Sequence, residues 1–441
     1  MSTRSFLLLS GAFPLLVTCG GGGGAGTADT QESASLSGTV ESSFAIDING
    51  QSHRGQAIAL QNGKVIVCGQ VQTLTGTDSF VLRLDSEYAL DQSFGTNGIT
   101  VFSASSKNDG VLAVSEDGDA RLVVAGFADD EGGNRKVMLG RLTPDGVLDT
   151  TFGTGGILTM QIGETTKDTN MNREIAFYGL ALPEGDDRIV AAGAAISGSQ
   201  PTMFVAQFLE ASLDPSFGED GIVWAQFESG AKSGVKTLAI ASSGEIVAAG
   251  WAVLPSQVSA VGTEAVFWVL EPDGQEKVLL SFDFGNGGWD DIYGAACDKD
   301  GKVIVVGSSS DPGGSLRYYA GARLTLQGEF DSSFGTGGKA VFDHDSEKRE
   351  EWKSVAVGSE GEYYAVGTSR ISGEESYISV ACLDVDGTLR TSFGSSGLVN
   401  ISIGARPSAG YGCRLEAGKL YVVGTVGQET SNPDIGVAVV R

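Results

Sequence analysis

Histidine is nearly absent from this chain of 441 residues, which contains only His53 and His344. A zinc site or a histidine-based nucleophile needs several such groups brought together, so either chemistry has little material here. His53 precedes the first of the repeats described below, and His344 lies in the charged stretch DHDSEKREEW. We expect both to be solvated loop residues.

Lysine and arginine are also scarce, because 29 of them stand against 55 aspartates and glutamates, which gives a formal net charge of −26. That much negative charge repels nucleic acid and anionic lipid headgroups. We therefore expect no nucleic-acid partner. The charge is scattered along the chain with no acidic tail, a pattern that favours solubility over cation binding.

The usual nucleotide-binding and hydrolase motifs are missing: there is no P-loop, no GxGxxG after a strand, no GxSxG and no CxxC. Three calcium-like words, DKDG, DVDG and DING, stand where hairpin turns are expected and lack the further oxygen ligands of a calcium loop. Cys68 and Cys413 stand where other repeats carry alanine, so we expect them to be small core residues. The sequence predicts no catalytic residue, no cofactor and no metal site.

The first residues have the pattern of an export signal. Arg4 supplies a positive charge, and residues 6–17 are apolar but too few to span a bilayer permanently. The stretch LVTC, which ends at Cys19, resembles a bacterial lipobox, although Thr18 stands where such motifs usually carry Gly, Ala or Ser. The resemblance implies cleavage before Cys19 and lipidation of that residue. An ordinary secretory signal with an incidental cysteine is the alternative.

We therefore assign 1–18 to a lipoprotein signal peptide and 19–41, which is rich in Gly, Ser and Thr, to a disordered tether. No other segment of the sequence is apolar enough to cross a membrane. These features predict a protein of the bacterial cell envelope, on the periplasmic or the surface side of the outer membrane, that meets the membrane through its lipid alone.

A short apolar run that ends in glycine recurs seven times. The spacings between successive glycines are 57, 67, 57, 57, 60 and 57 residues, and such regularity indicates a repeat architecture. An apolar stretch and a tight turn precede each copy, and two more strand-like segments follow it. The unit is therefore four short antiparallel strands. The glycines are Gly69, Gly126, Gly193, Gly250, Gly307, Gly367 and Gly424.

The middle strands of each unit are apolar throughout and do not alternate with polar residues. Strands of that kind are covered on both faces. A propeller supplies this cover because each blade lies between two neighbours. A β-solenoid is the nearest competitor, but four strands per repeat favour a blade. We therefore predict that residues 42–441 form an all-β fold, a seven-bladed β-propeller of four-stranded antiparallel blades.

The two ends of the chain indicate how the ring closes. The last unit stops at Arg441, after its third strand, and an unassigned strand at 42–48 precedes the first unit. We expect this N-terminal strand to take the missing fourth place in the C-terminal blade, beside residues 435–441. Such pairing closes the ring and hides the sheet edges.

A second phrase, of the form LDxSFGxxG, stands between the third and fourth strands of a unit. We expect its phenylalanine to fill the gap between blades, its aspartate and serine to bond nearby backbone, and its glycines to adopt positive φ. The phrase is missing from the seventh unit, where the chain is interrupted, and from the fourth, where the turn runs directly into the next strand. The phenylalanines are Phe94, Phe152, Phe217, Phe334 and Phe393.

The phrases DGxLDxSFGxxGxV and GKIVVAG resemble the bacterial delta-60 repeats, which are common in exported proteins. The likeness covers residues 42–441. It implies a propeller-like array, and the family has no catalytic residues to carry over to this chain. A weaker likeness to NHL-type propellers is confined to the strand order.

The loops that join second to third strands, and one unit to the next, are long and varied, and they should emerge on one face of the ring. Variation over a constant scaffold is where binding tends to occur. We expect a binding or scaffold lipoprotein that meets a protein or glycan on this long-loop face. The alternatives are an enzyme that uses Asp, Glu and Arg at the central depression, and a purely structural envelope protein. The candidate partner-binding residues are Lys167, Asn170, Arg173, Trp251, Trp289, Arg317, His344 and Trp352.

Overall fold

The computed structural model describes residues 35–48, 50–166, 169–257, 262–342, 349–370, 376–404, 407–427 and 432–441. Within these ranges it contains 29 β-strands, one short helix, α1 (Thr169–Glu174), and one 3-10 turn (Pro255–Gln257). The expectation of an all-β chain is confirmed. No helix among these residues is long and apolar enough to cross a membrane. The expected signal peptide, with Cys19 just after it, lies outside the described residues.

In the described part of the chain the strands form six sheets, and their strands pair antiparallel with one exception. The exception is a single parallel bridge, Arg317↔Arg349, which joins two antiparallel groups into one eight-stranded sheet. The sheets that precede this joint are β2 (His53–Gln61), β3 (Lys64–Gln72), β4 (Thr77–Leu84) and β5 (Ile99–Phe102); β6 (Asp109–Glu116), β7 (Leu122–Asp129), β8 (Arg135–Leu142) and β9 (Ile157–Met160); β10 (Ala176–Ala181), β11 (Arg188–Ser197), β12 (Gln200–Leu209), β13 (Ser212–Leu213) and β14 (Ile222–Trp224); and β15 (Lys232–Ile240), β16 (Ile246–Val253), β17 (Glu264–Leu270) and β18 (Glu276–Phe282).

The eight-stranded sheet and the sheet formed by the two chain ends complete the fold. The eight strands are β19 (Asp290–Cys297), β20 (Lys302–Ser310), β21 (Arg317–Thr325), β22 (Lys339–Phe342), β23 (Arg349–Val357), β24 (Tyr363–Arg370), β25 (Ser376–Leu383) and β26 (Leu398–Ile401). The last sheet has the order β1 (Val40–Ile46), β29 (Asp434–Val440), β28 (Lys419–Val426) and β27 (Ser408–Glu416).

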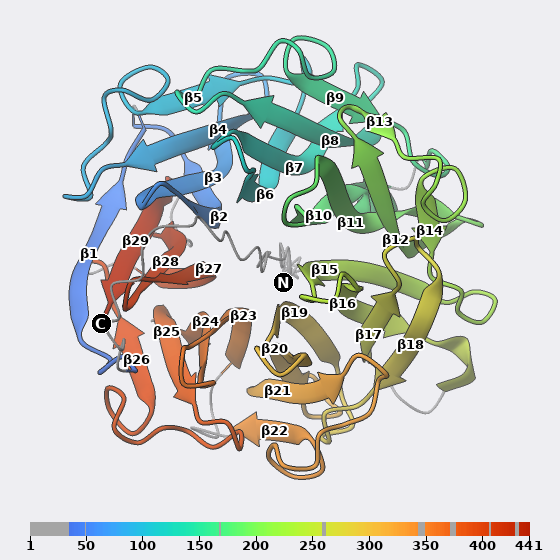
Figure 1. Ribbon diagram of the computed structural model, residues 1–441, viewed down its shortest axis with the longest axis vertical. Coiled ribbons are helices and arrows are strands. Elements are labelled where there is room, and N and C mark those ends of the chain that lie inside the picture. Colours follow the sequence, from blue (N-terminus) through green and yellow to red (C-terminus); the bar gives the residue numbers. More distant parts are fainter. Residues whose placement is uncertain are drawn as a thin grey trace, which may run out of the picture.

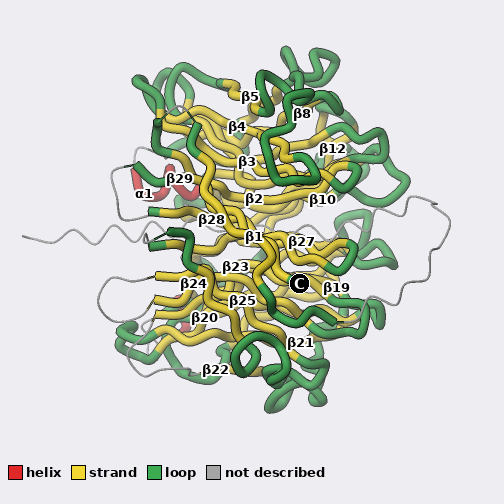
Figure 2. Tube along the Cα trace, turned by 90° about the vertical axis from the view of Figure 1, so that its left-hand side faces the viewer, coloured by secondary structure: helices red, strands yellow, loops and turns green. Residues whose placement is uncertain are grey.

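The innermost strands surround the centre of the molecule (Figure 1). In chain order they are β2, β6, β10, β15, β19, β23 and β27. Each contacts the next, and β27 contacts β2. Seen from the edge, the strands cross the thickness of the ring, and loops gather at its faces, with α1 at one of them (Figure 2). The sheets are therefore small and stand around a common axis.

Hydrophobic clusters fill the spaces between neighbouring sheets. Ile66 and Cys68 of β3 meet Val124 of β7 in one such cluster, and all three are fully buried. β7 is buried along its whole length. The prediction that middle strands are covered on both faces is confirmed, and so is the core position of Cys68 and Cys413, which are buried and not in disulfides.

Tight turns set the register of the first two strands in a sheet. Between β2 and β3, Asn62 and Gly63 both have positive φ, 51° and 74°. Two consecutive residues of this kind form the type I′ turn, whose twist matches that of the flanking strands. The sequence pair Asn-Gly therefore determines where this hairpin reverses.

The two ends of the chain pair with each other. β1 runs antiparallel to β29, with partners from Val40↔Val440 to Ile46↔Ile435. The pairing predicted between the N-terminal strand and the C-terminal segment is present. It begins two residues earlier than 42, and its last pair is at Ile46.

The last residues of the predicted tether pack against the folded chain. Leu36 is 7% exposed and belongs to the hydrophobic cluster around β24, β25 and β28. The backbone carbonyl oxygen of Ser37 accepts a hydrogen bond from the backbone N–H of Gly394 at 2.9 Å. In the first two sheets the carbonyl oxygen of Asp145 accepts the equivalent bond from Gly95 at 2.7 Å. Residues 35–41 therefore belong to the folded part of the chain, because they form the turn that the C-terminal unit lacks.

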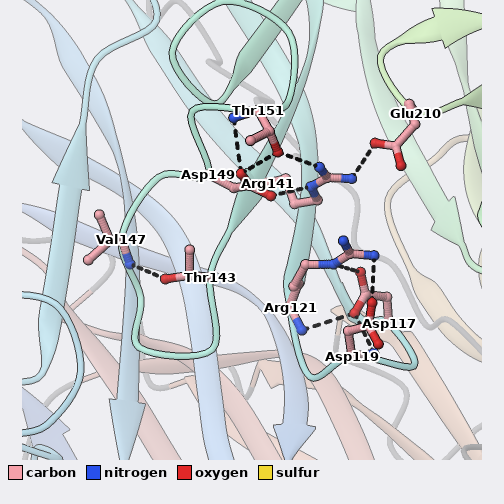
Figure 3. A network of polar contacts seen from close by, with 9 residues as sticks. All are labelled: Asp117, Asp119, Arg121, Arg141, Thr143, Val147, Asp149, Thr151 and Glu210. Atoms are coloured by element: carbon pink, nitrogen blue, oxygen red, sulfur yellow. Dashed lines mark hydrogen bonds and ion pairs between the residues drawn. The ribbon is translucent and has the colours of Figure 1, made fainter.

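An arginine outside the LDxSFGxxG phrase organises the corner that the phrase forms. Arg141, on β8, donates from Nε to Asp149 Oδ2 (2.8 Å) and from Nη2 to Thr151 Oγ1 (3.1 Å) (Figure 3). Its Nη1 reaches Glu210 Oε2, just past β12 of the next sheet, at 2.5 Å. Such charge-assisted bonds are stronger than neutral ones, and here they join two sheets. The arrangement recurs at Arg83–Asp91–Ser93 and Arg323–Asp331–Ser333.

The expectations for the phenylalanines and the glycines of the phrase are confirmed, whereas the serine hydroxyl bonds the aspartate carboxylate and not the backbone, as Ser93 does with Asp91 Oδ1. All five phenylalanines are 0% exposed, and the glycine after each has φ of 53° or 54°. The ring of Phe94 lies against Gly146 of the next sheet, where an added Cβ would stand 2.6 Å from the ring. The phenylalanine therefore fills the space between sheets.

We expect Gly38→Ala to lower the free energy of unfolding by about 2–4 kcal/mol. Gly38 has φ of +81°, and an added Cβ would lie 2.4 Å from the backbone nitrogen of Gly394. Gly63→Ala is the matched control, because its φ is +74° but nothing lies within 4 Å of the added atom. Urea unfolding checks this prediction, and equal losses in the two variants would contradict it.

Candidate functional site

Each innermost strand carries a β-bulge at the same place in the repeat, where one residue is skipped in the pairing with the second strand. Skipped residues of neighbouring innermost strands meet. Lys236 Nζ lies 4.8 Å from the centre of the Tyr178 ring, and Lys353 Nζ lies 3.4 Å from that of Tyr293. The bulges therefore direct large polar side chains toward one another. The skipped residues are Gln56, Leu112, Tyr178, Lys236, Tyr293, Lys353 and Tyr411.

Five of the residues on β19, β21 and β23 form a charged group, which we call the axial cluster: Asp291, Tyr293, Arg317, Glu351 and Lys353. Lys353 Nζ is 3.1 Å from Glu351 Oε2. Arg317 Nη1 approaches the same oxygen to 3.4 Å. Tyr293 donates its hydroxyl to Asp291 Oδ2 at 3.1 Å. One carboxylate oxygen thus receives two cationic groups from two strands.

The axial cluster is closed at one end and open at the other. Lys353 and Tyr293 are buried, whereas the side chains of Arg317 and Glu351 keep 20% and 25% of their surface exposed. Arg317 directly follows the loop between β20 and β21, so the open end lies on the long-loop face. Among the described residues, Lys353 Nζ has no partner in hydrogen-bond geometry, and its contact with Glu351 is ionic. A buried ammonium held this way is incompletely satisfied.

The charges of the axial cluster shift one another's pKa values. Burial would raise the pKa of Glu351, but Lys353 and Arg317 outweigh it and hold that pKa below its ordinary value. Burial lowers the pKa of Lys353, and Glu351 offsets only part of this effect. For Arg317, Tyr293 and Glu351 overcome the effect of burial and raise the pKa. Glu351 is therefore ionised at neutral pH and can act as an acceptor, not as a proton donor.

Two of the predicted partner-binding residues come together at the open end of the axial cluster. Arg317 Cζ lies 6.0 Å from the centre of the Trp289 ring. Trp289 directly precedes β19 and is 42% exposed. Tryptophan and arginine are the residue types most enriched at the energetic centres of binding surfaces. An exposed aromatic face beside paired charges can therefore bind a polar ligand from this side.

Two other predicted residues belong to a second group, around the skipped residues Tyr178 and Lys236. Lys236 Nζ lies 6.0 Å from the centre of the Trp251 ring. Tyr178 donates its hydroxyl to the carbonyl oxygen of Arg173 at 3.4 Å. The side chain of Arg173, in α1, is exposed. Arg173 of α1 and Trp251 of β16 therefore lie beside the same pair of residues, Tyr178 of β10 and Lys236 of β15.

The expectation that Trp352 contacts a partner is wrong. Its side chain is fully buried, and its ring is stacked on Tyr319 with ring centres 4.8 Å apart. The solvated position expected for His53 is also wrong, because His53 begins β2 and is fully buried. Lys167 and His344 lie outside the described residues, and so does the side chain of Asn170.

A buried aspartate stands three positions before two of the skipped residues, Leu112 and Tyr293. Asp109 accepts hydrogen bonds from the backbone N–H and hydroxyl of Ser79, at 2.9 and 2.6 Å, and burial raises its pKa to about 6. Asp290 has the equivalent position on β19, but in the described structure neither of its carboxylate oxygens has a hydrogen-bond partner. Burial and the neighbouring Asp283 raise its pKa to about 8. Asp290 therefore keeps a proton at neutral pH.

A surface hollow of about 550 Å³ lies apart from the axial cluster. It is lined by residues of β22 and of the loops at 284–286, 335–336 and 387–389, among them Asn286, Lys339 and Phe342. None of its lining residues belongs to the axial cluster. The two features are therefore separate candidates for ligand contact.

Sequence reasoning missed four residues of the axial cluster: Asp291, Tyr293, Glu351 and Lys353. A signal was present, because aligned first strands carry Gln, Leu, Tyr, Lys, Tyr, Lys and Tyr at one position inside otherwise apolar runs. Only the bulge explains why that position tolerates large polar groups. An apolar strand pattern alone assigns such residues to a covered face.

A family model described as "Domain of unknown function (DUF5122) beta-propeller" matches residues 118–152 and 299–334. Each stretch runs from a turn before a second strand to the phenylalanine of the LDxSFGxxG phrase. The chain is a β-propeller. No curated protein matches it.

Solved structures resemble this propeller at low identity. A polysaccharide lyase, Uly1, is 10% identical with a TM-score of 0.47, over 97% of this chain and 96% of that one. A protein of unknown function from Dyadobacter fermentans is 9% identical with a TM-score of 0.46, over 91% and 99%. A Trypanosoma rangeli sialidase is 12% identical with a TM-score of 0.43, over 90% and 59%. Likeness at this level carries no information on what the propeller binds.

We expect Asp290→Asn to flatten the pH dependence of stability. Between about pH 4 and pH 8 the folded state keeps a proton on Asp290 that the unfolded chain releases, so stability falls as the pH rises. In the parent protein this group makes the free energy of unfolding fall between pH 5 and pH 8. In Asp290→Asn we expect that fall to be smaller by about 2–4 kcal/mol.

Urea unfolding at the two pH values measures this difference. Asp300→Asn is the control, because Asp300 is exposed in a turn. A parent-like difference between pH 5 and pH 8 in Asp290→Asn would show that Asp290 is ionised in the folded protein.

Proposed function

We propose that the chain is a seven-bladed propeller closed by β1, and that it is an exported, lipid-anchored binding module of the bacterial envelope. Seven innermost strands that contact one another in succession support this count, if the parallel bridge Arg317↔Arg349 is taken as the boundary between two blades. The pairing of β1 with β29 supports the closure. The lipobox-like stretch and the resemblance to delta-60 repeats support export and anchoring.

The observation that carries the binding function is the open end of the axial cluster. Trp289 is the exposed part, and Arg317 and Glu351 lie behind it as a charged pair. The buried Lys353, which lies over the Tyr293 ring, holds Glu351 in place. A rigid base under an exposed aromatic residue is pre-organised, which reduces the entropy lost on binding. The ligand in this proposal is a protein or glycan of the envelope or the surroundings.

Binding is favoured over catalysis by the protonation state of the axial cluster. An enzyme that uses only Asp, Glu and Arg needs an acid with a raised pKa close to its substrate. Glu351 has a lowered pKa instead, because two cationic side chains adjoin it. Asp290 has a raised pKa but is 1% exposed, so a substrate does not reach it in this conformation. A propeller enzyme therefore remains the second candidate.

We expect Trp289→Ala to abolish capture of the partner from native envelopes, or to weaken it at least about tenfold, because truncation of such a central aromatic typically costs about 2 kcal/mol or more. Leu74→Ala is the matched control. Leu74 is a fully exposed apolar residue in the loop between β3 and β4, on the same long-loop face. Quantitative cross-linking and capture with the full-length protein measure the effect, with thermal unfolding as a check of the fold.

Loss of capture in Leu74→Ala but not in Trp289→Ala would place the binding surface elsewhere on the long-loop face. Capture that survives both substitutions would contradict the axial cluster as the binding site.

We expect Cys19→Ala to move most of the protein from the membrane fraction to the soluble fraction, because stable anchoring depends on the acyl chains. Fractionation combined with labelling by a radioactive fatty acid measures this change. Cys68→Ala is the control, since other repeats carry alanine at that position. Labelling that persists in Cys19→Ala would contradict lipidation at this residue.

A further inference from the structure

Three groups that can ligate a metal ion meet where the two ends of the chain join the first sheet. Asp47 lies just past β1, Asp434 begins β29, and His53 begins β2. One ligand atom from each of the three residues lies within 4.8 Å of the others. The site therefore spans both strands of the terminal pairing and the innermost strand of the next sheet.

One nitrogen of the His53 ring is committed to the backbone. Nε2 lies 2.8 Å from the carbonyl oxygen of Ile48, so this nitrogen carries the hydrogen and donates it. Nδ1 has no hydrogen-bond partner in the described part of the chain and lies 4.0 Å from Asp47 Oδ1. His53 is fully buried. Metal-binding histidines have this arrangement: one N–H is bound by a carbonyl, and the lone pair of the other nitrogen faces the ion.

We propose that Asp47, His53 and Asp434 bind a divalent transition-metal cation, for which Zn²⁺ is the appropriate probe. One imidazole nitrogen with two carboxylate oxygens suits zinc and its neighbours, whereas Ca²⁺ and Mg²⁺ take oxygen ligands. In a tetrahedral zinc site, ligand atoms about 2.1 Å from the metal stand about 3.4 Å apart. The three ligand atoms lie within 4.8 Å of one another here, so only a small contraction brings them to that spacing.

The chain around the site allows that contraction. The side chain of Asp47 is 54% exposed, so it can move toward the buried imidazole. Asp47 Oδ1 accepts a hydrogen bond from the backbone N–H of Gly50 at 2.8 Å, which orients the carboxylate. The backbone N–H of His53 donates to the carbonyl oxygen of Pro433, the residue before Asp434, at 2.8 Å. These bonds hold the three ligands in one place without the ion.

A cation at this site fastens the two ends of the chain to each other and to β2. An ion that binds only the folded state stabilises it by mass action, and the gain rises with metal concentration. The segment that benefits most is β1, because it is the edge strand of its sheet and β29 is its one neighbour in the described β-ladder. The site thus has a structural role, independent of the binding function proposed for the axial cluster.

The test uses the purified full-length protein after treatment with a chelator. Thermal unfolding and calorimetric titration are measured with ZnCl₂, and with CaCl₂ and MgCl₂ as comparisons. We expect Zn²⁺ to bind at this site and to raise the melting temperature, and amide hydrogen exchange in 40–46 to slow. We expect Asp47→Asn and Asp434→Asn each to weaken Zn²⁺ binding at least about tenfold.

Both asparagine variants keep the size of the side chain, so they test the ligands without a change in packing. Asp300→Asn, in an exposed turn, should bind Zn²⁺ as the parent does. No stabilisation by Zn²⁺, or parent-like Zn²⁺ affinity in both aspartate variants, would overturn the proposal. An equal response to Ca²⁺ would also overturn it, because the carboxylates alone would then account for binding.

Discussion

The pairing of β1 with β29 is the constraint on which the rest of the propeller depends. Every sheet in this fold relies on a neighbour on each side to cover its apolar faces, as the fully buried β7 shows. An open array would leave two such faces in water. The terminal sheet takes one strand from the front of the chain and three from the back, so the first and last repeats cannot separate without breaking a β-ladder. Leu36 and Ser37 extend the same junction to the turn before β1.

Polar side chains have two different roles in this fold. At three of the corners formed by LDxSFGxxG an arginine of the third strand has several partners: Arg141 bonds Asp149, Thr151 and Glu210. Fully satisfied networks of this kind specify how two sheets dock. The axial cluster is different, because Lys353 is buried without a directed hydrogen bond and Glu351 stays partly exposed. An unsatisfied group of this kind costs stability, which is why such groups point to a ligand when they lie beside an exposed surface.

Most of the fold could be predicted from the sequence, and only part of the site. The four-stranded repeats, the buried phenylalanines and the N-terminal strand all follow from local patterns and from counting, and the structure contains each of them. Trp352 shows where this reasoning fails, since an aromatic residue next to a charged loop can equally be core, and here it is stacked on Tyr319. The arginines of the corners were visible in the third strands, but their link to the phrase depends on a contact across eight residues and into the next sheet.

The sequence by itself determined the repeat, the all-β class and the positions of the turns, because these depend on residues near one another along the chain. Apolar runs and turn residues with positive φ, such as Asn62 and Gly63, act locally along the chain. Only the tertiary structure decided which side chains share a site. Lys353 and Tyr293 are sixty positions apart in the sequence, and they touch because β19 and β23 are neighbouring innermost strands whose bulges turn toward each other. His53 and Asp434 meet because β29 lies beside β2, although the two strands stand near opposite ends of the sequence.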